Sequence, residues 1–146
     1  MVATSMLGSS ALALPMLGMM LLTLLVWLTM FVTRVGFARK HKLDIEQFKT
    51  PADVQALIPG DQSAPSNNFK NLFELPVIFY ALCLYLTATS QVDGFYINCA
   101  WAFLALRALH SLIHCSYNRV AHRFAIYILS SIVLWVMVFR AFFAAV

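Results

Sequence analysis

A line of polar and ionisable side chains crosses an otherwise apolar part of this sequence. Arg107, His110, His114 and Tyr117 follow one another at intervals of three, four and three residues. In an α-helix this spacing places all four side chains on one face. Lipid cannot solvate guanidinium and imidazole groups, so we expect the face to meet other helices or a water-filled cavity.

The spacing of His110 and His114 raises the question of a metal site. Two histidines at i and i+4 can hold a metal ion from one face of a helix. No carboxylate or third histidine lies in register with them in the sequence. We therefore predict no metal at this position, and polar contacts for both rings.

The composition requires that these residues lie within a membrane. Of the 146 residues, 62% are hydrophobic and 11% are charged, whereas soluble domains carry about 25% charged residues. A bilayer core needs about 20 apolar residues in helical form, and backbone groups in hydrocarbon must pair internally, which favours helices. The sequence predicts an all-α membrane protein, a single four-helix domain over 1–146, with spans at about 12–33, 68–89, 95–117 and 123–143.

Two local features modify this plan. Pro76 lies inside the second span, where it removes a backbone hydrogen bond and should kink the helix. The long first connection, about 34–67, contains the run Thr50-Pro51-Ala52-Asp53. This run is typical of a helix start, with Thr as N-cap and Pro at the first position. We expect a short amphipathic helix at the membrane surface there.

The positive charges predict the orientation. Lys and Arg are concentrated in the 34–67 connection and at Arg119 and Arg123, whereas the N-terminal tail and the 90–94 turn contain none. The positive-inside rule then places both basic connections in the cytoplasm and both termini outside it. The same distribution argues against a nucleic-acid partner, although the net charge is +4. Arg140 is expected to extend to the outer interface beside Phe139 and Phe142.

Glu74 and Arg107 are the two ionisable residues that lie deepest in the predicted membrane spans. At helical rise, Glu74 lies about 7–8 Å and Arg107 about 10 Å from the cytoplasmic ends of their spans. The matching depths predict an ion pair between the second and third helices. Such a pair can simply hold helices together or form part of a ligand site, and both interpretations stay open here.

The run Asn68-Phe69-Lys70-Asn71-Leu72-Phe73-Glu74-Leu75-Pro76, the segment from Trp101 to His114 and Tyr117-Asn118-Arg119 resemble the MAPEG family, membrane-associated proteins in eicosanoid and glutathione metabolism. The resemblance is greatest to its bacterial branch and covers nearly the whole chain. It implies a homotrimer with sites between adjacent subunits, open to the cytoplasm, and a bacterial inner membrane. Its enzymes activate glutathione as thiolate for conjugation, peroxide reduction or isomerisation of lipophilic substrates.

The resemblance also implies roles for particular residues. Asn71 and Glu74 match the family's Asn-x-x-Glu element, and Tyr117 and Arg119 match a Tyr and an Arg near the junction of helices three and four. We predict glutathione contacts from Asn71, Glu74, Arg107, His110, His114 and Tyr117. Arg119 or Arg123 is the candidate that lowers the thiol pKa. Glutathione-using members carry arginine shortly before this Asn, where the chain has Asn67 and Asn68, with Lys70 as the basic residue.

Three functions follow as hypotheses. The first is a glutathione-dependent transferase or peroxidase acting on lipophilic electrophiles. The alternative is a non-catalytic lipid-binding or scaffolding membrane protein of the same fold. The third is a small proton-coupled transporter, for which Glu74 would be the essential membrane carboxylate.

Overall fold

The computed structural model describes residues 11–60 and 62–146. The described chain is helical, and its elements follow the order α2 (Ala13–Lys40), the 3₁₀ turn η1 (Ile45–Phe48), α3 (Pro51–Leu57), α4 (Ala64–Asn71), α5 (Leu75–Ala88), α6 (Gly94–Cys115) and α7 (Val120–Ala145). The N-terminal tail, on which the predicted orientation partly rests, lies outside the described residues.

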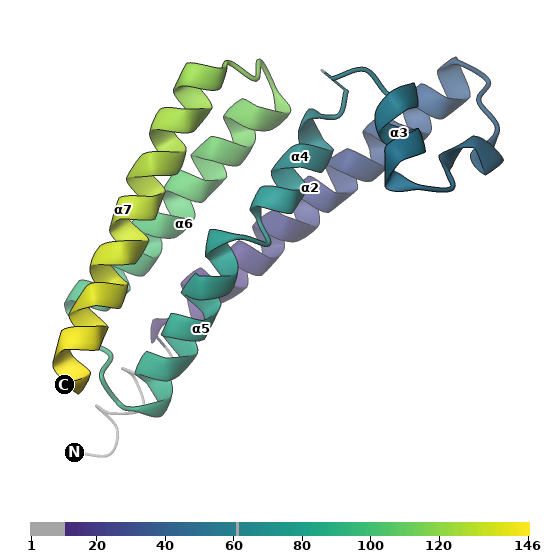
Figure 1. The fold of residues 1–146 in the computed structure, drawn as a ribbon. Coiled ribbons are helices and arrows are strands. Elements are labelled where there is room, and N and C mark those ends of the chain that lie inside the picture. Colours follow the sequence, from purple (N-terminus) through teal and green to yellow (C-terminus); the bar gives the residue numbers. More distant parts are fainter. Residues whose placement is uncertain (1–10, 61) are drawn as a thin grey trace.

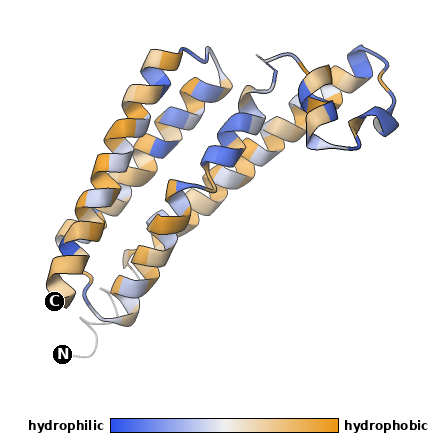
Figure 2. Cartoon of the chain, viewed as in Figure 1, coloured by the Kyte–Doolittle hydropathy of each residue, from blue (hydrophilic) through white to orange (hydrophobic). Residues whose placement is uncertain are grey.

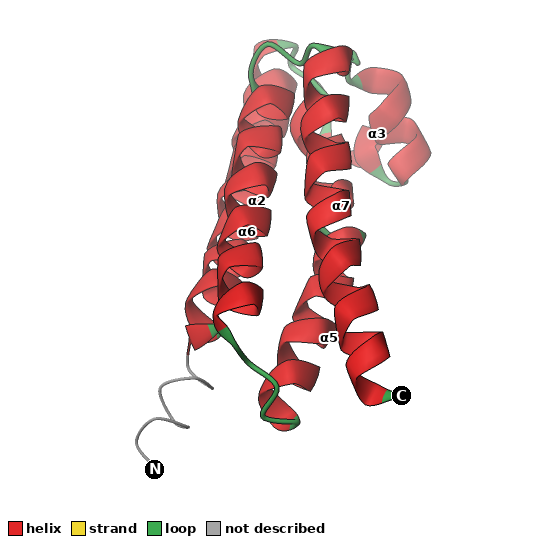
Figure 3. Ribbon diagram, turned by 90° about the vertical axis from the view of Figure 1, so that its left-hand side faces the viewer, coloured by secondary structure: helices red, strands yellow, loops and turns green. Residues whose placement is uncertain are grey.

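Four helical segments in the described chain are long and apolar enough to cross a membrane, as predicted. They are α2, α4 and α5 taken together over Ala64–Ala88, α6 and α7. The first helix continues to Lys40, beyond the expected end at residue 33, and so shortens the first connection. Helices α6 and α7 form an antiparallel pair, and α2 lies along α4 and α5 (Figures 1 and 3).

The second span is broken in its middle. Helix α4 ends at Asn71 and α5 starts at Leu75, with Glu74 between them in a non-helical conformation (φ −99°, ψ −103°). Pro76 explains the break, because it has no N–H to donate to the carbonyl one turn earlier. The kink expected at Pro76 is confirmed, and the second span, predicted at about 68–89, consists of the two helices α4 and α5.

The packing separates an aromatic interior from a lipid-facing exterior. Phe79 of α5 and Phe103 of α6 are fully buried and stack with their ring centroids 4.7 Å apart. Large apolar side chains such as Leu25, Phe124 and Phe143 are mostly exposed on the outside of the bundle. Hydropathy colouring shows this apolar surface along the helices, with polar residues gathered toward one end (Figure 2). An apolar exterior of this kind is stable in lipid and not in water.

Two connections have well-defined local structure. Thr50 and Asp53 form a capping box at the start of α3, which confirms the predicted N-cap. At the opposite end of the bundle, Arg140 forms a two-pronged ion pair with Asp93, at 3.0 and 2.6 Å. Its guanidinium lies 4.5 Å from the ring centroids of Phe95 and Tyr96. The sequence analysis named Phe139 and Phe142 as its neighbours and missed Asp93, Phe95 and Tyr96, which come close only in the folded bundle.

Candidate functional site: a polar cavity between α4, α6 and α7

A polar cavity of about 460 Å³ lies between the broken second span and the α6–α7 pair. Its volume falls in the range of about 300–1,000 Å³ that small-molecule pockets occupy. The residues lining it are Asn67, Lys70, Asn71, Glu74, His110, His114, Val120, Arg123, Phe124 and Tyr127. The structure thus brings five of the predicted site residues to one cavity: Asn71, Glu74, His110, His114 and Arg123.

Arg123 is held at the edge of this cavity by two side chains. Its Nη1 lies 2.8 Å from His114 Nε2 and 2.5 Å from Asn118 Oδ1. Asn118 adopts a positive φ of 49° in the turn before α7, a conformation that Asn tolerates better than most residues. Because a guanidinium only donates, His114 Nε2 accepts here, and the proton of a neutral His114 is on Nδ1.

His110 is held in place by a hydrogen bond to the backbone of Arg123. Its Nδ1 lies 2.9 Å from the carbonyl oxygen of Arg123. A carbonyl oxygen can only accept, so His110 Nδ1 carries a proton and donates it. Two consecutive turns of α6 therefore attach to the beginning of α7 and keep His110, His114 and Arg123 in fixed relative positions.

Several buried nitrogens around the cavity have no hydrogen-bond partner within the described chain. They are Nε and Nη1 of Arg107, Nε2 of His110 and Nδ1 of His114. Arg107 is fully buried, and the two histidines are 2% and 3% exposed. Buried polar groups without partners cost about 1–3 kcal/mol each, and more when they are charged. Such a concentration is typical of a site that is completed by another molecule.

The predicted ion pair between Glu74 and Arg107 is not formed. Arg107 Nη2 instead donates to the carbonyl oxygen of Asn71 at 2.9 Å. The ion pairs in the described chain are Lys49–Glu46 and Arg140–Asp93. The helix break at residues 72–74 explains the difference, because it turns Glu74 away from the direction that a continuous helix would give it and leaves the Asn71 carbonyl free to accept.

Tyr127 occupies the position between these two charges and was missed by the sequence analysis. Its hydroxyl donates to Glu74 Oε2 at 3.5 Å, and its ring centroid lies 5.4 Å from Arg107 Cζ. The spacing of Arg123 and Tyr127 at i and i+4 is the signal that could have found it, since both lie on one face of α7. Asn67 and Lys70 were likewise not proposed as site residues, although both line the cavity and lie on the same face of α4 as Asn71.

Three predicted site residues do not line the cavity: Arg107, which is buried beside it, Tyr117 and Arg119. Tyr117 is 61% exposed, and its hydroxyl lies 3.1 Å from His122 Nδ1. Arg119 is exposed and takes the N-cap position of α7. Neither side chain lines the cavity, so the α6–α7 turn directs Arg123 inward and Arg119 outward.

The two histidines of the predicted polar face lie edge to face, with ring centroids 5.5 Å apart. Within residues 11–60 and 62–146, no three His, Cys, Asp or Glu side chains are grouped closely enough to hold a metal ion. The polar groups that line the cavity are guanidinium, ammonium, imidazole, amide and phenol groups and one carboxylate, that of Glu74.

These features define a four-helix integral membrane protein with a polar cavity near one end of its bundle. The model of the MAPEG family matches residues 12–143, nearly the whole chain. The chain belongs to the MAPEG family, as its sequence resemblance predicted. Neither the curated proteins nor the solved structures give a significant match to it.

Proposed function

We propose that this chain is a membrane enzyme that binds glutathione in the polar cavity and directs its thiolate at lipophilic electrophiles or peroxides. The observation that carries the proposal is the charge pattern of the cavity. Lys70 and Arg123 line it and Arg107 is buried beside it, against the single carboxylate of Glu74. Glutathione carries two carboxylates and one ammonium group, which is the complementary arrangement.

Each group of the tripeptide has a partner in this scheme. Lys70, Arg123 and the free donors of Arg107 bind carboxylates by charge-assisted hydrogen bonds. Glu74 accepts from the ammonium group, while Asn71 donates through its amide. Lys70 cannot present the planar fork of an arginine, so its carboxylate contact is a single point of charge.

Arg123 is the residue proposed to activate the thiol. A guanidinium near a thiol favours the thiolate and lowers its pKa, and the thiolate is the nucleophile. In conjugation the thiol proton passes to solvent and the thiolate sulfur forms a bond to an electrophilic carbon, while the bond from that carbon to its leaving group breaks and the leaving group departs with the electron pair. Lipophilic substrates reach the sulfur from the bilayer, because the cavity lies within the span of the helices.

The family membership leads us to propose a homotrimer with the cavity close to a neighbouring subunit. A second subunit would supply an acceptor to the unpartnered Nδ1 of His114. We propose that the cavity end faces the cytoplasm of a bacterial inner membrane, with both termini on the other side, because Arg34, Arg39, Lys40 and Lys42 are at that end.

Calorimetric titration of reduced glutathione into the detergent-solubilised protein tests the proposal. We expect micromolar to low-millimolar binding that Arg123→Ala weakens about ten- to a hundredfold, the loss of one charge-assisted hydrogen bond. Arg119→Ala is the matched control, an arginine in the same turn that points away from the cavity, and should bind normally. A thiol-dependent turnover assay with a hydrophobic electrophile then separates an enzyme from a binding protein.

The contrary result would support the alternative hypothesis. No heat of binding, in protein that remains folded and assembled, would exclude glutathione as the ligand. The fold would then serve a non-catalytic lipid-binding or scaffolding role, with Arg107 and the histidines as structural contacts between helices. Loss of binding in Arg119→Ala with normal binding in Arg123→Ala would instead move the site to the outer side of the α6–α7 turn.

A further inference from the structure

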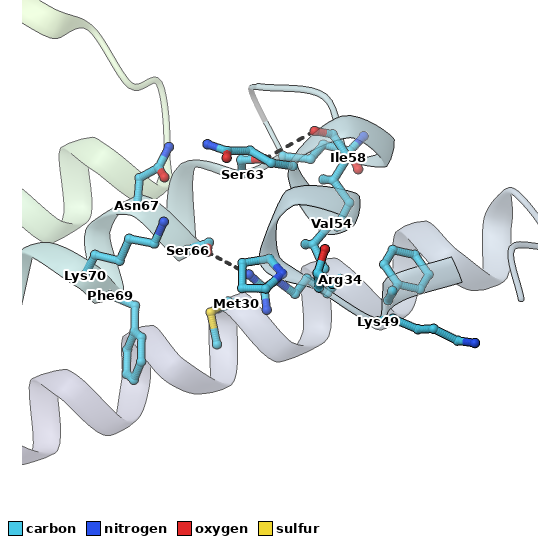
Figure 4. A pocket seen from close by; sticks show the side chains of 15 residues that line it. Met30, Arg34, Lys49, Val54, Ile58, Ser63, Ser66, Asn67, Phe69 and Lys70 are labelled. Carbon is cyan, nitrogen blue, oxygen red and sulfur yellow. Dashed lines mark hydrogen bonds between the residues drawn. The ribbon is translucent and has the colours of Figure 1, made fainter. Parts of the chain in front are cut away.

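A second cavity, which shares Asn67 and Lys70 with the one proposed for glutathione, lies between α2, α3 and α4 at the end of the bundle where the basic residues gather. Its volume is about 490 Å³. Arg34 enters it from α2, Lys49 borders it from the segment before α3, and Lys70 enters it from α4 (Figure 4). None of its described lining residues is an Asp or a Glu; Asp61 lies outside the described residues.

The cavity has both polar and apolar walls. Ser66 lies beside Arg34, whose Nη2 donates to Ser66 Oγ at 2.7 Å. Met30, Phe69 and Ile58 supply apolar walls. Met30 is one helical turn before Arg34, and so lies deeper along the membrane-spanning part of α2. Cationic and apolar surfaces thus follow one another along the helix axis.

The depth of Arg34 places this change of polarity at the membrane interface. Arg34 lies 21 residues beyond Ala13, the start of α2, which corresponds to a rise of about 32 Å. The hydrocarbon core of a bilayer is about 30 Å thick. The guanidinium therefore reaches the level of lipid headgroups, and Met30 the level where acyl chains begin.

We propose that this cavity binds the phosphate headgroup of an anionic phospholipid, with the start of an acyl chain along Met30 and Phe69. Arg34 is the principal ligand, because a guanidinium matches two phosphate oxygens at once. Lys70 adds a second charge from α4, and Lys49 adds one at the rim, where it also pairs with Glu46 at 3.3 Å. Basic pockets between helices near the cytoplasmic surface are suited to this class of ligand.

The bound lipid would connect α2 to the segment before α3 and to α4. In the protein alone, Arg34 and Ser66 provide a direct hydrogen bond between α2 and α4. A phosphate that accepts hydrogen bonds from Arg34 and Lys70 would bridge the same two helices with charge-assisted bonds. The lipid should therefore stabilise the folded protein as well as bind to it.

The test measures melting temperature and bound lipid together. The purified protein is placed in mixed micelles that contain phosphatidylglycerol or phosphatidylcholine with identical acyl chains, and native mass spectrometry counts the retained lipids. We expect phosphatidylglycerol to raise the melting temperature more than phosphatidylcholine and to remain bound. Glycerol 3-phosphate alone, at millimolar concentration, should give no shift, because it lacks the acyl chain.

Variants separate a built site from diffuse surface charge. Arg34→Gln should weaken phosphatidylglycerol binding about fivefold or more, the effect of one interfacial cation, and Lys49→Gln should weaken it less. Arg39→Gln is the matched control, an exposed arginine on the same helix that does not line the cavity. Ser66→Ala removes the internal hydrogen bond and keeps the cation, so it should retain the lipid effect even if Arg34→Gln folds poorly.

Two outcomes would overturn the proposal. If Arg39→Gln loses as much of the phosphatidylglycerol effect as Arg34→Gln, or if Ser66→Ala abolishes it, the effect comes from general surface charge or from the α2–α4 contact. If glycerol 3-phosphate stabilises the protein as strongly as the lipid does, the occupant is a soluble phosphate compound and not a phospholipid.

Discussion

Arg123 Nη1 lies 2.8 Å from His114 Nε2, across the turn that joins α6 to α7. The same guanidinium contacts Asn118 Oδ1 at 2.5 Å within that turn. His114 and Asn118 thus both accept from Nη1 of Arg123 and fix the orientation of its guanidinium. The remaining donors of Arg123 are left for the cavity that it lines.

This contact predicts that His114 and Arg123 act as a unit in ligand binding. His114→Ala should weaken glutathione binding about three- to tenfold, because the guanidinium loses its orientation but keeps its charge. In the double variant with Arg123→Ala, little further loss is expected, since neighbours in one network are not additive. Calorimetric titration of both single variants and the double variant gives the coupling directly. Fully additive losses would show that His114 contacts the ligand independently of Arg123.

Arg107→Met should separate ligand binding from stability. Arg107 is fully buried and makes one hydrogen bond, to the Asn71 carbonyl, while Nε and Nη1 have no partner in the described chain. Replacing such a buried charge with an apolar side chain of similar length is often neutral or stabilising. We expect an unchanged or higher melting temperature and glutathione affinity at least tenfold weaker.

Lys70→Met is the matched comparison for Arg107→Met, because Lys70 lines the same cavity but is exposed. Lys70→Met should weaken glutathione binding less than Arg107→Met does, and should leave the melting temperature nearly unchanged. A large fall in melting temperature for Arg107→Met, with binding intact, would instead assign Arg107 to holding the helices together.

The sequence predicted those features that depend on local chemistry. Apolar runs set the four spans, Pro76 set the break in the second one, and Thr50 with Asp53 set the start of α3. Each of these follows from residues within one or two helical turns. Helical spacing likewise placed Arg107, His110 and His114 on one buried face of α6.

The contacts between helices could not be predicted in the same way. A kink at Pro76 was foreseen, but not the rotation of Glu74 that follows when three residues leave the helix, so the pairing with Arg107 failed. Tyr127 was not predicted as a site residue, because α7 has the composition of an apolar span. Its partners Glu74 and Arg107 are also far away in the sequence. Arg140 was assigned to neighbours on its own helix, whereas its partner Asp93 comes close only in the folded bundle.

Gly18 should be required for the close approach of α2 and α6. A Cβ atom at this position would lie 2.6 Å from Leu104 Cδ2, and small residues at such contacts let membrane helices pack closely. Gly18→Ala should be tolerated with a small loss of stability, because the end of the Leu104 side chain can move. Gly18→Ile should lower the melting temperature clearly, because a branched side chain needs more space than Leu104 can give.

Gly36 supplies the control for this prediction, as it lies on the same helix and a Cβ atom there would meet nothing within 4 Å. Gly36→Ile should leave the melting temperature nearly unchanged. Equal effects of the two isoleucine variants would mean that helix propensity, and not the contact with Leu104, decides the result.

The Arg140–Asp93 pair predicts how stability depends on pH at the other end of the bundle. The Arg140 guanidinium, with two hydrogen bonds to the carboxylate, holds the pKa of Asp93 below its ordinary value. The unfolded chain has a carboxyl pKa of about 3.9. A carboxyl group whose pKa is lower in the folded state contributes stability that is fully present above about pH 4. That contribution is lost as the pH falls through the folded pKa.

The measurement compares melting temperatures of the native protein, Arg140→Gln and Asp93→Asn between pH 7 and pH 3. Asp93 also accepts a hydrogen bond from the backbone N–H of Tyr96 at the start of α6. Because Asn is a good N-cap, Asp93→Asn removes the charge and keeps the cap. Both variants should melt below the native protein at pH 7, and the difference should shrink as the pH falls below about 4. A difference that stays constant down to pH 3 would show that Arg140 acts through the rings of Phe95 and Tyr96, since that contact does not depend on the charge of Asp93.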